Sequence, residues 1–495
     1  MSEEQSSYRQ IMKATSIFGG VQVFQIIIQV IRSKFVALLL GPEGMGITGL
    51  LYTTTNLISG LTNFGLVTSS VKNIAEANKT EDQNRIAIVI TVLRKLVWLT
   101  GTLGAIITLV FSPFLSQLTF GNRDYTLAFI FISITLLFNQ LTNGQMALLQ
   151  GLRKLQYLAK ANLAGSSIGL VIVIPMYYKW GIDAIVPGII ITSIVSLALA
   201  LFFSKKVKIK SVTVSREMTF AEGKSMLSMG FMISLAGILT IVSAYLIRIY
   251  ISYKGGIDQV GLFNAGFVLI ETYVGLVFTA MSADYYPRLS AVNDDTEKTR
   301  DIVTQQAITA LLILVPVVVL FIVFIPEIII ILYSSQFLLI NLMVRIAILG
   351  IVFRAASFSM GYILFAKGDS SLFLKTSLGF NSVFLINNLL GYKFYGLTGL
   401  GISFTLNFII HFLALTIITK YRYDFKFKPE FTKIFMLSII FCLLAFLLSL
   451  IASKVIFYIL GSLMLILTSL YSLHELNKRM NLIELLSKYK SKTNS

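Results

Sequence analysis

Charged side chains recur inside the long apolar runs of this sequence. The cations within these runs or at their edges are Arg32, Lys34, Arg94, Lys95, Arg248, Arg345 and Arg354. Guanidinium and ammonium groups bind phosphates and carboxylates through charge-assisted hydrogen bonds. Glu271, near the middle of one apolar run, carries the opposite charge. The set predicts recognition of an anion in apolar surroundings, with Glu271 either taking up a proton or neutralising an arginine.

Two sets of polar side chains accompany these cations at helical spacing. Each set falls on one helix face at about 100° per residue, the first within about 80° and the second within roughly 60°. The first set is Gln22, Gln25, Gln29 and Arg32, and the second is Tyr52, Asn56, Ser59 and Asn63. Lipid cannot solvate such faces, so they contact either another helix or water. We expect them to line a water-filled cavity.

Motifs for bond-making chemistry are absent from the sequence. The P-loop pattern, the His-Glu-x-x-His pattern and any cysteine cluster are missing, which argues against ATP and zinc sites. Cys442 is the only cysteine, so no internal disulfide can form. We interpret the two histidines, His411 and His474, as packed or interfacial residues. The sequence therefore predicts no cofactor, no metal and no enzymatic activity.

The elements that position these residues are membrane helices. With 56% apolar residues, 13% charged residues and a mean hydropathy of +0.82 over 495 residues, the composition is that of an all-α multi-span membrane protein. Runs of about 20 apolar residues predict fourteen spans. They are 11–40, 45–71, 86–112, 125–149, 161–178, 184–204, 225–252, 259–283, 302–331, 337–366, 371–391, 397–419, 431–452 and 455–473. The first run has no signal-peptide cleavage site and is interpreted as a signal anchor.

The placement of lysine and arginine predicts the orientation. A net charge of +18 would suggest nucleic acid for a soluble chain, but between spans these charges set topology. One side of the predicted spans, which includes Arg9 and Lys13, collects 29 of the 41 lysines and arginines, and the other side receives 5. We therefore expect both termini in the cytoplasm and no nucleic-acid partner.

Sequence features recur about 215 residues apart. The matching pairs are Glu43 and Gly46 with Asp258 and Gly261, Val71-Lys72 with Pro287-Arg288, and Trp180-Gly181-Ile182 with Tyr395-Gly396-Leu397. They predict two six-helix lobes of the same topology, as in the parallel repeats of some secondary transporters. The expected domains are 1–204, a basic linker at 205–224, 225–419, and two further helices with a tail at 420–495. The polar cavity is expected between the lobes.

The predicted depth of each ion separates the candidate residues. Glu271 occupies the repeat position of Asn56 and is expected on the same cavity-facing row. Arg345 and Arg354 lie about 180° apart around one predicted helix, so only one of them would face the cavity. Arg354 is deeper and is favoured, and Lys34, Arg248 and Arg345 lie near enough to the outer surface to snorkel.

Several short motifs stand out along the first twelve predicted helices. The main one is Lys34-x-x-Ala37 followed by Gly41-Pro42-Glu43-Gly44-Met45-Gly46. The others are Val71-Lys72-Asn73-Ile74-Ala75-Glu76, Gly151-Leu152-Arg153-Lys154 with Asn162 and Gly165-Ser166, and Tyr285-Tyr286-Pro287-Arg288-Leu289-Ser290. Together they resemble the O-antigen translocases, the Wzx-type flippases of lipid-linked oligosaccharides, particularly the enterobacterial common antigen type. The likeness covers the first twelve helices. Lys34 departs from it, because on an ideal helix it lies nearly opposite the first polar face.

This resemblance implies the multidrug/oligosaccharidyl-lipid/polysaccharide (MOP) exporter fold, a V of two lobes around a cationic cavity that opens alternately to each side. It implies an undecaprenyl-pyrophosphate-linked oligosaccharide as substrate in a bacterial inner membrane, with membrane lipids and other polysaccharide assembly proteins as partners. Coupling to H⁺ or Na⁺ through Glu271 would fit. The expected cavity residues are Arg32, Lys34, Arg248, Arg345, Arg354, Gln22, Gln25, Gln29, Tyr52, Asn56 and Asn63.

Three other functions stay open. A cation-coupled drug exporter of the same superfamily would favour an acidic or aromatic pocket, whereas cations outnumber acids here. A membrane-bound glycan polymerase or acyltransferase would usually present a large loop with chemistry-bearing residues, and the longest connection is the basic 205–224 segment. A non-transporting membrane scaffold would give no reason for the polar faces.

Overall fold

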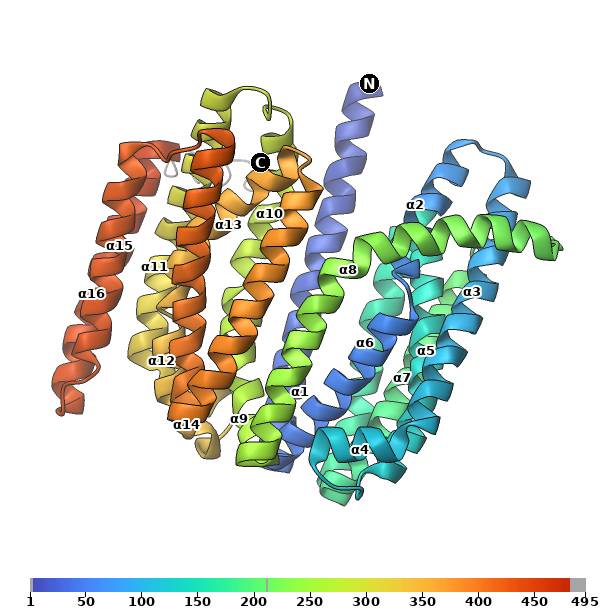
Figure 1. Cartoon of the computed structure of the whole chain (residues 1–495), viewed down its shortest axis with the longest axis horizontal. Helices are drawn as coiled ribbons and strands as arrows, with labels where there is room; N and C mark the ends of the chain where they lie inside the picture. The colour runs from blue at the N-terminus through green and yellow to red at the C-terminus, as the bar shows by residue number, and fades with distance from the viewer. Residues whose placement is uncertain (1–2, 211, 481–495) are drawn as a thin grey trace, which may run out of the picture. The chain divides into compact units, whose positions relative to one another are not determined.

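A computed structural model describes residues 3–210 and 212–480, and every regular element there is helical (Figure 1). The side chains of Arg9 and Lys13 lie outside the described part. In chain order the elements are α1 Glu3–Thr62, α2 Leu66–Lys79, α3 Gln83–Val110, α4 Ser112–Phe120, α5 Thr126–Gly151, α6 Leu155–Trp180, η1 Gly181–Ala184, α7 Ile185–Lys205, α8 Arg216–Gly255, α9 Ile257–Val268, η2 Leu269–Val274, α10 Leu276–Ser290, α11 Thr296–Leu332, η3 Ser335–Ile340, α12 Asn341–Ala347, α13 Gly350–Ala366, α14 Ser370–Tyr423, α15 Pro429–Leu448 and α16 Lys454–Met480.

The chain forms two compact units. Unit 1 comprises Met1–Gly261 with Leu332–Ser334, and unit 2 comprises Leu262–Ile331 with Ser335–Ser495. Helix α8 falls in unit 1 because it packs against α1, α2 and α3. Figure 1 shows its first turns lying across the α2–α3 end of that unit before the helix bends. Each unit is a set of residues that pack mainly against one another. The expected lobes, which follow the sequence repeat and begin their second half at residue 225, stay a prediction.

Several long helices fold back on themselves at glycine. In a straight helix, residues 20 positions apart would be about 30 Å apart. Arg32 and Tyr52 of α1 nevertheless share a hydrogen bond of 2.9 Å, because Gly41 between them has non-helical dihedrals of φ 66° and ψ −166°. The same holds in α14, where Asn387 Nδ2 donates to Asn407 Oδ1 at 2.7 Å. Both α1 and α14 are therefore hairpins.

The 215-residue offset recurs in the backbone itself. Gly181 has φ 56° and ψ −132°, and Gly396 has φ 55° and ψ −137°. Gly41 and Gly256 also share a positive φ, of 66° and 88°. Glycine accepts these conformations without the steric cost that a Cβ would add. The repeat predicted from sequence thus corresponds to chain reversals at equivalent positions.

Among the described residues, nine helices are long and apolar enough to cross a membrane, or ten if the bent pair Ser335–Ala347 and Gly350–Ala366 is one span. Three of the nine, Val21–Thr62, Leu155–Lys205 and Ser370–Tyr423, have 42, 51 and 54 residues. One crossing needs only about 20. Each of the three therefore has the length of two crossings.

One predicted span is interrupted. The expected helix 45–71 ends at Thr62, and Leu66 starts α2. Phe64 and Gly65 between them have φ of 50° and 62°. A Cβ on Gly65 would lie 2.0 Å from the carbonyl oxygen of Gly230. Close approach of α8 therefore breaks the helix, an interaction that hydropathy cannot reveal.

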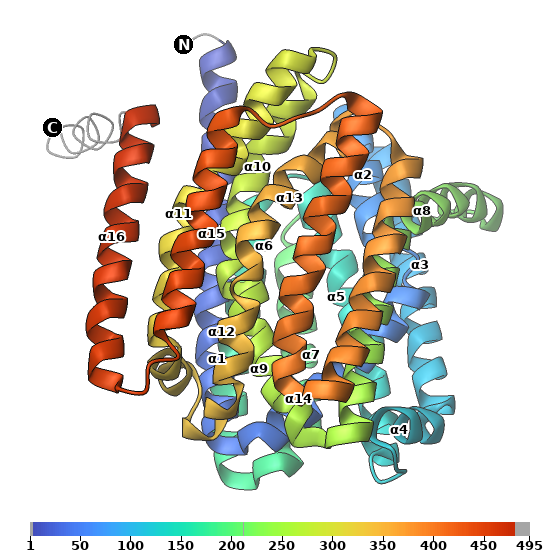
Figure 2. The same ribbon diagram turned by 60° about the vertical axis from the view of Figure 1, so that its left-hand side comes forward.

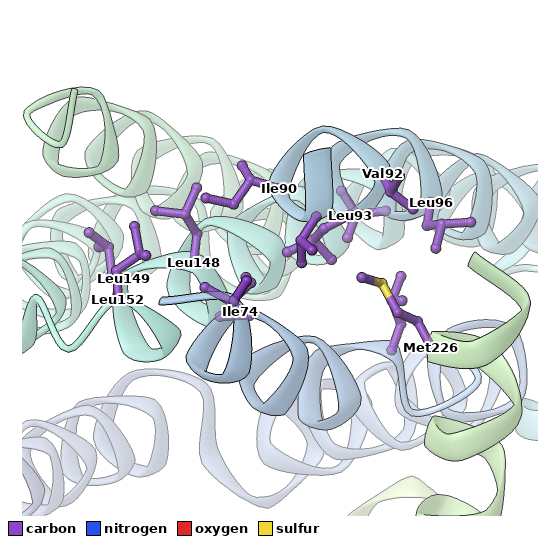
Figure 3. Close-up of a cluster of buried hydrophobic side chains, with 14 of the residues drawn as sticks. Ile74, Ile90, Val92, Leu93, Leu96, Leu148, Leu149, Leu152 and Met226 are labelled. Carbon is purple, nitrogen blue, oxygen red and sulfur yellow. The ribbon is translucent and has the colours of Figure 1, made fainter. Parts of the chain in front are cut away.

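Each unit has its own apolar core. In unit 1, buried side chains of α2, α3, α5 and α8 meet, including Ile74, Leu93, Leu149 and Met226 (Figure 3). In unit 2, Tyr285 is fully buried against α13, and its hydroxyl donates to the Ser359 carbonyl at 2.6 Å. Helices α15 and α16 pack against each other in unit 2, and α15 also contacts α13 (Figure 2).

Candidate functional site

Arg32 and Tyr52 face each other across the α1 hairpin. Arg32 Nη2 donates to Tyr52 Oη at 2.9 Å, and the guanidinium carbon lies 5.7 Å from the centroid of the same ring. The hydroxyl of Tyr177 on α6 lies beside this guanidinium. Arg32 thus occupies a partly buried site with two phenol hydroxyls around it.

Gln25 joins α1 to α6. Its Nε2 donates to the Asn162 carbonyl at 3.2 Å, and its Oε1 accepts from Ser166 Oγ at 3.0 Å. Side-chain hydrogen bonds of this kind hold membrane helices together. The structure therefore gives this member of the first polar face the helix-contact role, which was the alternative to a cavity role.

The other amides of the two polar faces differ in their surroundings. Gln22, Gln29 and Asn56 are exposed. Asn63 lies in the break after α1, where its Oδ1 accepts from the Gly65 amide at 2.8 Å. It therefore does not continue the helical face of Tyr52 and Asn56, and its side chain stabilises the turn into α2.

Lys34 and Arg248 both bind backbone carbonyls within unit 1. Lys34 Nζ donates to the Tyr333 carbonyl at 2.6 Å. Arg248 Nη1 donates to the Ala244 carbonyl, one turn earlier in α8, at 3.0 Å.

Glu271 and Arg354 form an ion pair inside unit 2. Arg354 Nη1 lies 2.9 Å from Glu271 Oε2, and the side chains are 20% and 26% exposed, respectively. The guanidinium carbon also lies 4.9 Å from the Phe278 ring centroid and 5.2 Å from that of Phe408. An ion at mid-membrane depth costs several kcal/mol unless it is paired or hydrated. The expected partnership between Glu271 and an arginine is formed.

Local helix geometry places Glu271. Leu269–Val274 is one turn of π-helix between α9 and α10. A Cβ on Gly275 would lie 1.8 Å from the Glu271 carbonyl oxygen, so glycine at this position permits the wide turn. Turns of π-helix inside α-helices occur often at functional sites. In the sequence, the sign of this π-helical turn is Gly275, four residues after Glu271.

Arg345 is separated from Arg354 by a bend. The predicted continuous helix 337–366 is divided into η3, α12 and α13, and the helices meet at 51°. Arg345 Nε donates to the Ile322 carbonyl at 3.1 Å, and its guanidinium lies 5.2 Å from the Phe457 ring centroid on α16. The two arginines therefore have separate surroundings, but the cause is this bend and not rotation around one continuous helix. Which of them faces a cavity stays a prediction.

Three residues beside these groups were not included among the sequence candidates. Tyr177 and Ser166 are supplied by α6, which lies more than a hundred residues along the chain from the α1 side chains that they contact. His411 of α14 lies 4.4 Å, centroid to centroid, from Phe380, and its Nδ1 is buried without a partner in the described residues. The charge of Arg354 acts on it. His411 is packed, as interpreted, but it belongs to the Arg354 surroundings.

The fold is that of known membrane transporters. A multidrug resistance MATE family transporter of the MOP superfamily, in its inward-facing conformation, matches 83% of this chain and 96% of its own length with a TM-score of 0.68 at 15% identity. The lipid II flippase MurJ, in an inward closed conformation, matches 95% and 99% with a TM-score of 0.68 at 15% identity. The chain therefore has the all-α MOP fold with several candidate membrane spans, and the expected fold class is confirmed at this level.

Residues 35–341 match the family model described as “Polysaccharide biosynthesis protein”. The match spans more than half of the chain, so the chain belongs to this family. It is 25% identical over 292 residues to the “Putative O-antigen transporter” of Shigella flexneri and covers 68% of that protein. It is 22% identical over 274 residues to the “Lipid III flippase” of Escherichia coli K12 and covers 65% of it. The resemblance predicted from the sequence is confirmed at the level of the family.

Proposed function

We propose that this protein moves a polyprenyl-pyrophosphate-linked oligosaccharide, such as an O-antigen repeat unit, from the cytoplasmic to the periplasmic leaflet. The observation that carries the proposal is the family match over residues 35–341, together with relatives whose names specify O-antigen and lipid III. The cationic side chains inside the helices support it, because a diphosphate cannot enter hydrocarbon without charge compensation.

The proposed architecture has fourteen crossings. The hairpins at Gly41, Gly181 and Gly396 each divide a long helical range into two spans. We also count the bent pair α12–α13 as one crossing, and α8, which is 40 residues long, as another. With these the proposed total is the fourteen expected from hydropathy. We assign the first twelve to two repeat-related lobes around a basic cavity and the last two, α15 and α16, to the periphery. Both termini are assigned to the cytoplasm on the charge bias.

The chemistry of the candidate residues suits the two parts of such a headgroup. Arg32 and Arg354 present guanidinium groups, whose planar donors match phosphate oxygens in pairs. Gln22, Gln29 and Asn56 are exposed amides that offer both donors and acceptors to sugar hydroxyls. Binding that favours one arrangement of the lobes then shifts the population between the two openings.

We assign ion coupling, where the transport cycle uses it, to Glu271. Its carboxylate compensates Arg354 at 2.9 Å, so protonation or cation binding at Glu271 would release a charged arginine toward an anionic substrate. Binding of the coupling ion at Glu271 and binding of the substrate phosphate at Arg354 would then favour each other, because each breaks the Glu271–Arg354 pair. A transport rate in Glu271→Gln that is independent of pH and equal to that of the wild type would exclude coupling through this residue.

A cation-coupled drug exporter is the second candidate. The surroundings of Arg354, with Glu271, Phe278 and Phe408, contain the acidic and aromatic groups that such a protein would favour. The equal TM-score to a multidrug transporter is a likeness of fold alone. Resistance of a deletion strain to a panel of cationic drugs, compared with its glycan export, separates the two functions.

The test is complementation of a strain that lacks the gene. We expect the deletion to accumulate a lipid-linked glycan on the cytoplasmic leaflet, and the wild-type gene to restore surface glycan. Arg32→Ala and Arg354→Ala should fail to restore it while still reaching the membrane. Arg123→Ala removes the same charge from an exposed loop and should complement fully. Full complementation by both cavity variants would remove the site assignment.

A further inference from the structure

A pocket of about 400 Å³ opens at one end of unit 1, where the α2–α3 turn, the α5–α6 turn and the segment after α7 meet. Its polar lining consists of Lys154, Lys206, Lys208, Asn78, Gln83 and Tyr157. Its floor is continuous with the apolar core of the unit through Ile86 and Leu152. A basic rim over an apolar floor is an amphiphilic site, and none of the residues proposed for transport lies in it.

The lysines of this pocket have no carboxylate partner among the described residues. In the part of the chain that the structure describes, no carboxylate forms an ion pair with Lys154, Lys206 or Lys208. Lys206 instead lies 4.4 and 5.3 Å from the ring centroids of Phe202 and Phe203. Three ammonium groups around one hollow repel one another, and an anion between them would relieve that repulsion.

The wall of the pocket is held in place. Lys210 donates to Asn84 Oδ1 at 2.9 Å, and Lys95 donates to the Val214 carbonyl at 3.0 Å. Arg85 forms a two-point ion pair with Glu222, one of whose bonds is 3.0 Å long. The first two contacts tie the segment after α7 to α3, and the ion pair ties α8 to α3. The segment that carries Lys206 and Lys208 is therefore attached to α3 just beyond the pocket.

The internal repeat offers a comparison for this pocket. Lys154 precedes α6 in unit 1, and Asp369, 215 residues later, precedes α14 in unit 2. The two residues share their backbone conformation, with φ −82° and ψ 56° at Lys154 and φ −79° and ψ 69° at Asp369. The residue before each has a positive φ, 55° at Arg153 and 70° at Gly368. The two helix starts are structurally equivalent, but their side chains have opposite charge.

In unit 2 the carboxylate of Asp369 accepts hydrogen bonds from three neighbouring residues. It accepts from the Leu372 amide at 3.1 Å, from Arg422 Nη2 at 3.3 Å and from the Tyr423 hydroxyl at 3.3 Å. The repeat equivalents of these three partners are Tyr157, Val207 and Lys208, all of which line the pocket. The start of α6 also has no side-chain cap. Unit 1 thus repeats the backbone conformation of this helix start but not its hydrogen bonds, because the Tyr157 amide donates to the Lys154 carbonyl at 3.0 Å and none of the described side chains there carries a negative charge.

We propose that the pocket binds a phosphate-bearing anion, which supplies the negative charge that the Asp369 side chain supplies in unit 2. The lysines supply charge, and the Asn78 and Gln83 amides supply hydrogen bonds. The partial positive charge at the start of α6 adds to this attraction, and the partial negative charges at the C-terminal ends of α2 and α7 oppose it. Because these helix-end effects oppose one another, we attribute the attraction mainly to the lysines. A lipid headgroup and a soluble phosphate share this chemistry. The inference does not rest on the proposed substrate.

The test uses the full-length protein in phosphatidylcholine nanodiscs, with two probes. Inorganic pyrophosphate, titrated by calorimetry, represents the soluble source, and phosphatidylglycerol, counted by native mass spectrometry, represents the lipid source. Lys154→Asp installs the carboxylate that unit 2 carries, and aspartate is a favourable helix cap, so the variant should fold. Lys160→Asp, also exposed and on α6, makes the same charge change outside the pocket.

We expect one of the probes to bind the wild type and Lys160→Asp equally, and to bind Lys154→Asp at least about tenfold more weakly. The probe that binds identifies the source of the phosphate. The proposal is overturned if neither probe binds the wild type above the phosphatidylcholine background. It is equally overturned if both variants lose binding to the same extent, because the effect would then be one of net charge. Either failure leaves glycan export by the wild type unaffected, so it is distinguishable from failure of the proposed function.

Discussion

Gly46 and Gly261, which the repeat relates, make reciprocal backbone contacts. A Cβ on Gly46 would lie 2.1 Å from the Ile257 carbonyl oxygen, and a Cβ on Gly261 would lie 1.8 Å from the Pro42 carbonyl oxygen. Pro42 and Ile257 are themselves 215 residues apart. Two equivalent chain junctions therefore cross, each packing its glycine on the other. Small residues allow such close crossings of membrane helices.

This crossing predicts that Gly46→Ala and Gly261→Ala destabilise the protein. Each added methyl group must displace backbone, and overpacking of this kind costs about 1–3 kcal/mol. Thermal unfolding in detergent measures the effect. Gly237→Ala, on α8 with nothing within 4 Å of the added carbon, is the control and should be neutral or stabilising. Equal melting temperatures for all three variants would contradict the crossing.

The Glu271–Arg354 pair predicts non-additive effects on stability. Glu271→Gln leaves a partly buried guanidinium without its carboxylate, and Arg354→Gln leaves the carboxylate alone, so each should destabilise by about 3–5 kcal/mol. The double variant should be more stable than the sum of the two single effects implies. A double-mutant cycle of unfolding free energies measures the coupling. Strict additivity would mean that the pair does not form.

Substitutions of Gln25 and Gln29, which lie on one helix face, should have different effects on stability and on transport. Gln25→Ala removes the hydrogen bonds to the Asn162 carbonyl and Ser166, so we expect about 1–2 kcal/mol of destabilisation. Gln29→Ala removes an exposed amide and should leave the melting temperature unchanged. Its glycan export should nevertheless fall, because the proposed sugar contact is lost. Export equal to that of the wild type in Gln29→Ala would remove this residue from the binding site.

Asp369 predicts a pH-dependent part of the stability. The Leu372 amide, and then Arg422, hold the pKa of this carboxyl below its ordinary value. Because this pKa is lowered in the folded state, Asp369 stabilises the fold at pH values above the ordinary pKa of about 3.9. This stabilisation is lost as the pH falls through the lowered pKa. The melting temperature of Asp369→Ala should therefore lie below that of the wild type at pH 7, and the gap should narrow on acidification below about pH 4. Asp294→Ala, which removes an exposed acid from the loop between α10 and α11, serves as the comparison. An equal, pH-independent gap in both variants would contradict the assignment.

The sequence was sufficient for features that depend on composition and spacing. Apolar runs predicted an all-helical membrane protein, and the repeat predicted Gly181 and Gly396 as equivalent positions, which share one backbone conformation. The Glu271–Arg354 pair was anticipated because mid-membrane ions require partners. These features follow from local chemistry and from the cost of polar groups in lipid.

Features that depend on contacts between distant segments were not predictable. The break at Asn63 arises where the Gly65 and Gly230 backbones meet, and hydropathy does not record such a contact. The helical wheel placed Gln25 with Gln22 and Gln29, but only the position of α6 shows that Gln25 is used between helices. The π-helix around Glu271 similarly needs the backbone to be seen.

The central claim is that this protein carries a lipid-linked oligosaccharide across a bilayer, and reconstitution tests it most directly. Purified protein in liposomes, loaded with a labelled polyprenyl-pyrophosphate oligosaccharide, would be assayed for the fraction of glycan accessible to an externally added glycosidase. The account predicts that the wild type and Arg123→Ala transfer the glycan between leaflets, and that Arg32→Ala and Arg354→Ala do so far more slowly. A transfer rate with the wild-type protein equal to that of protein-free liposomes would contradict it.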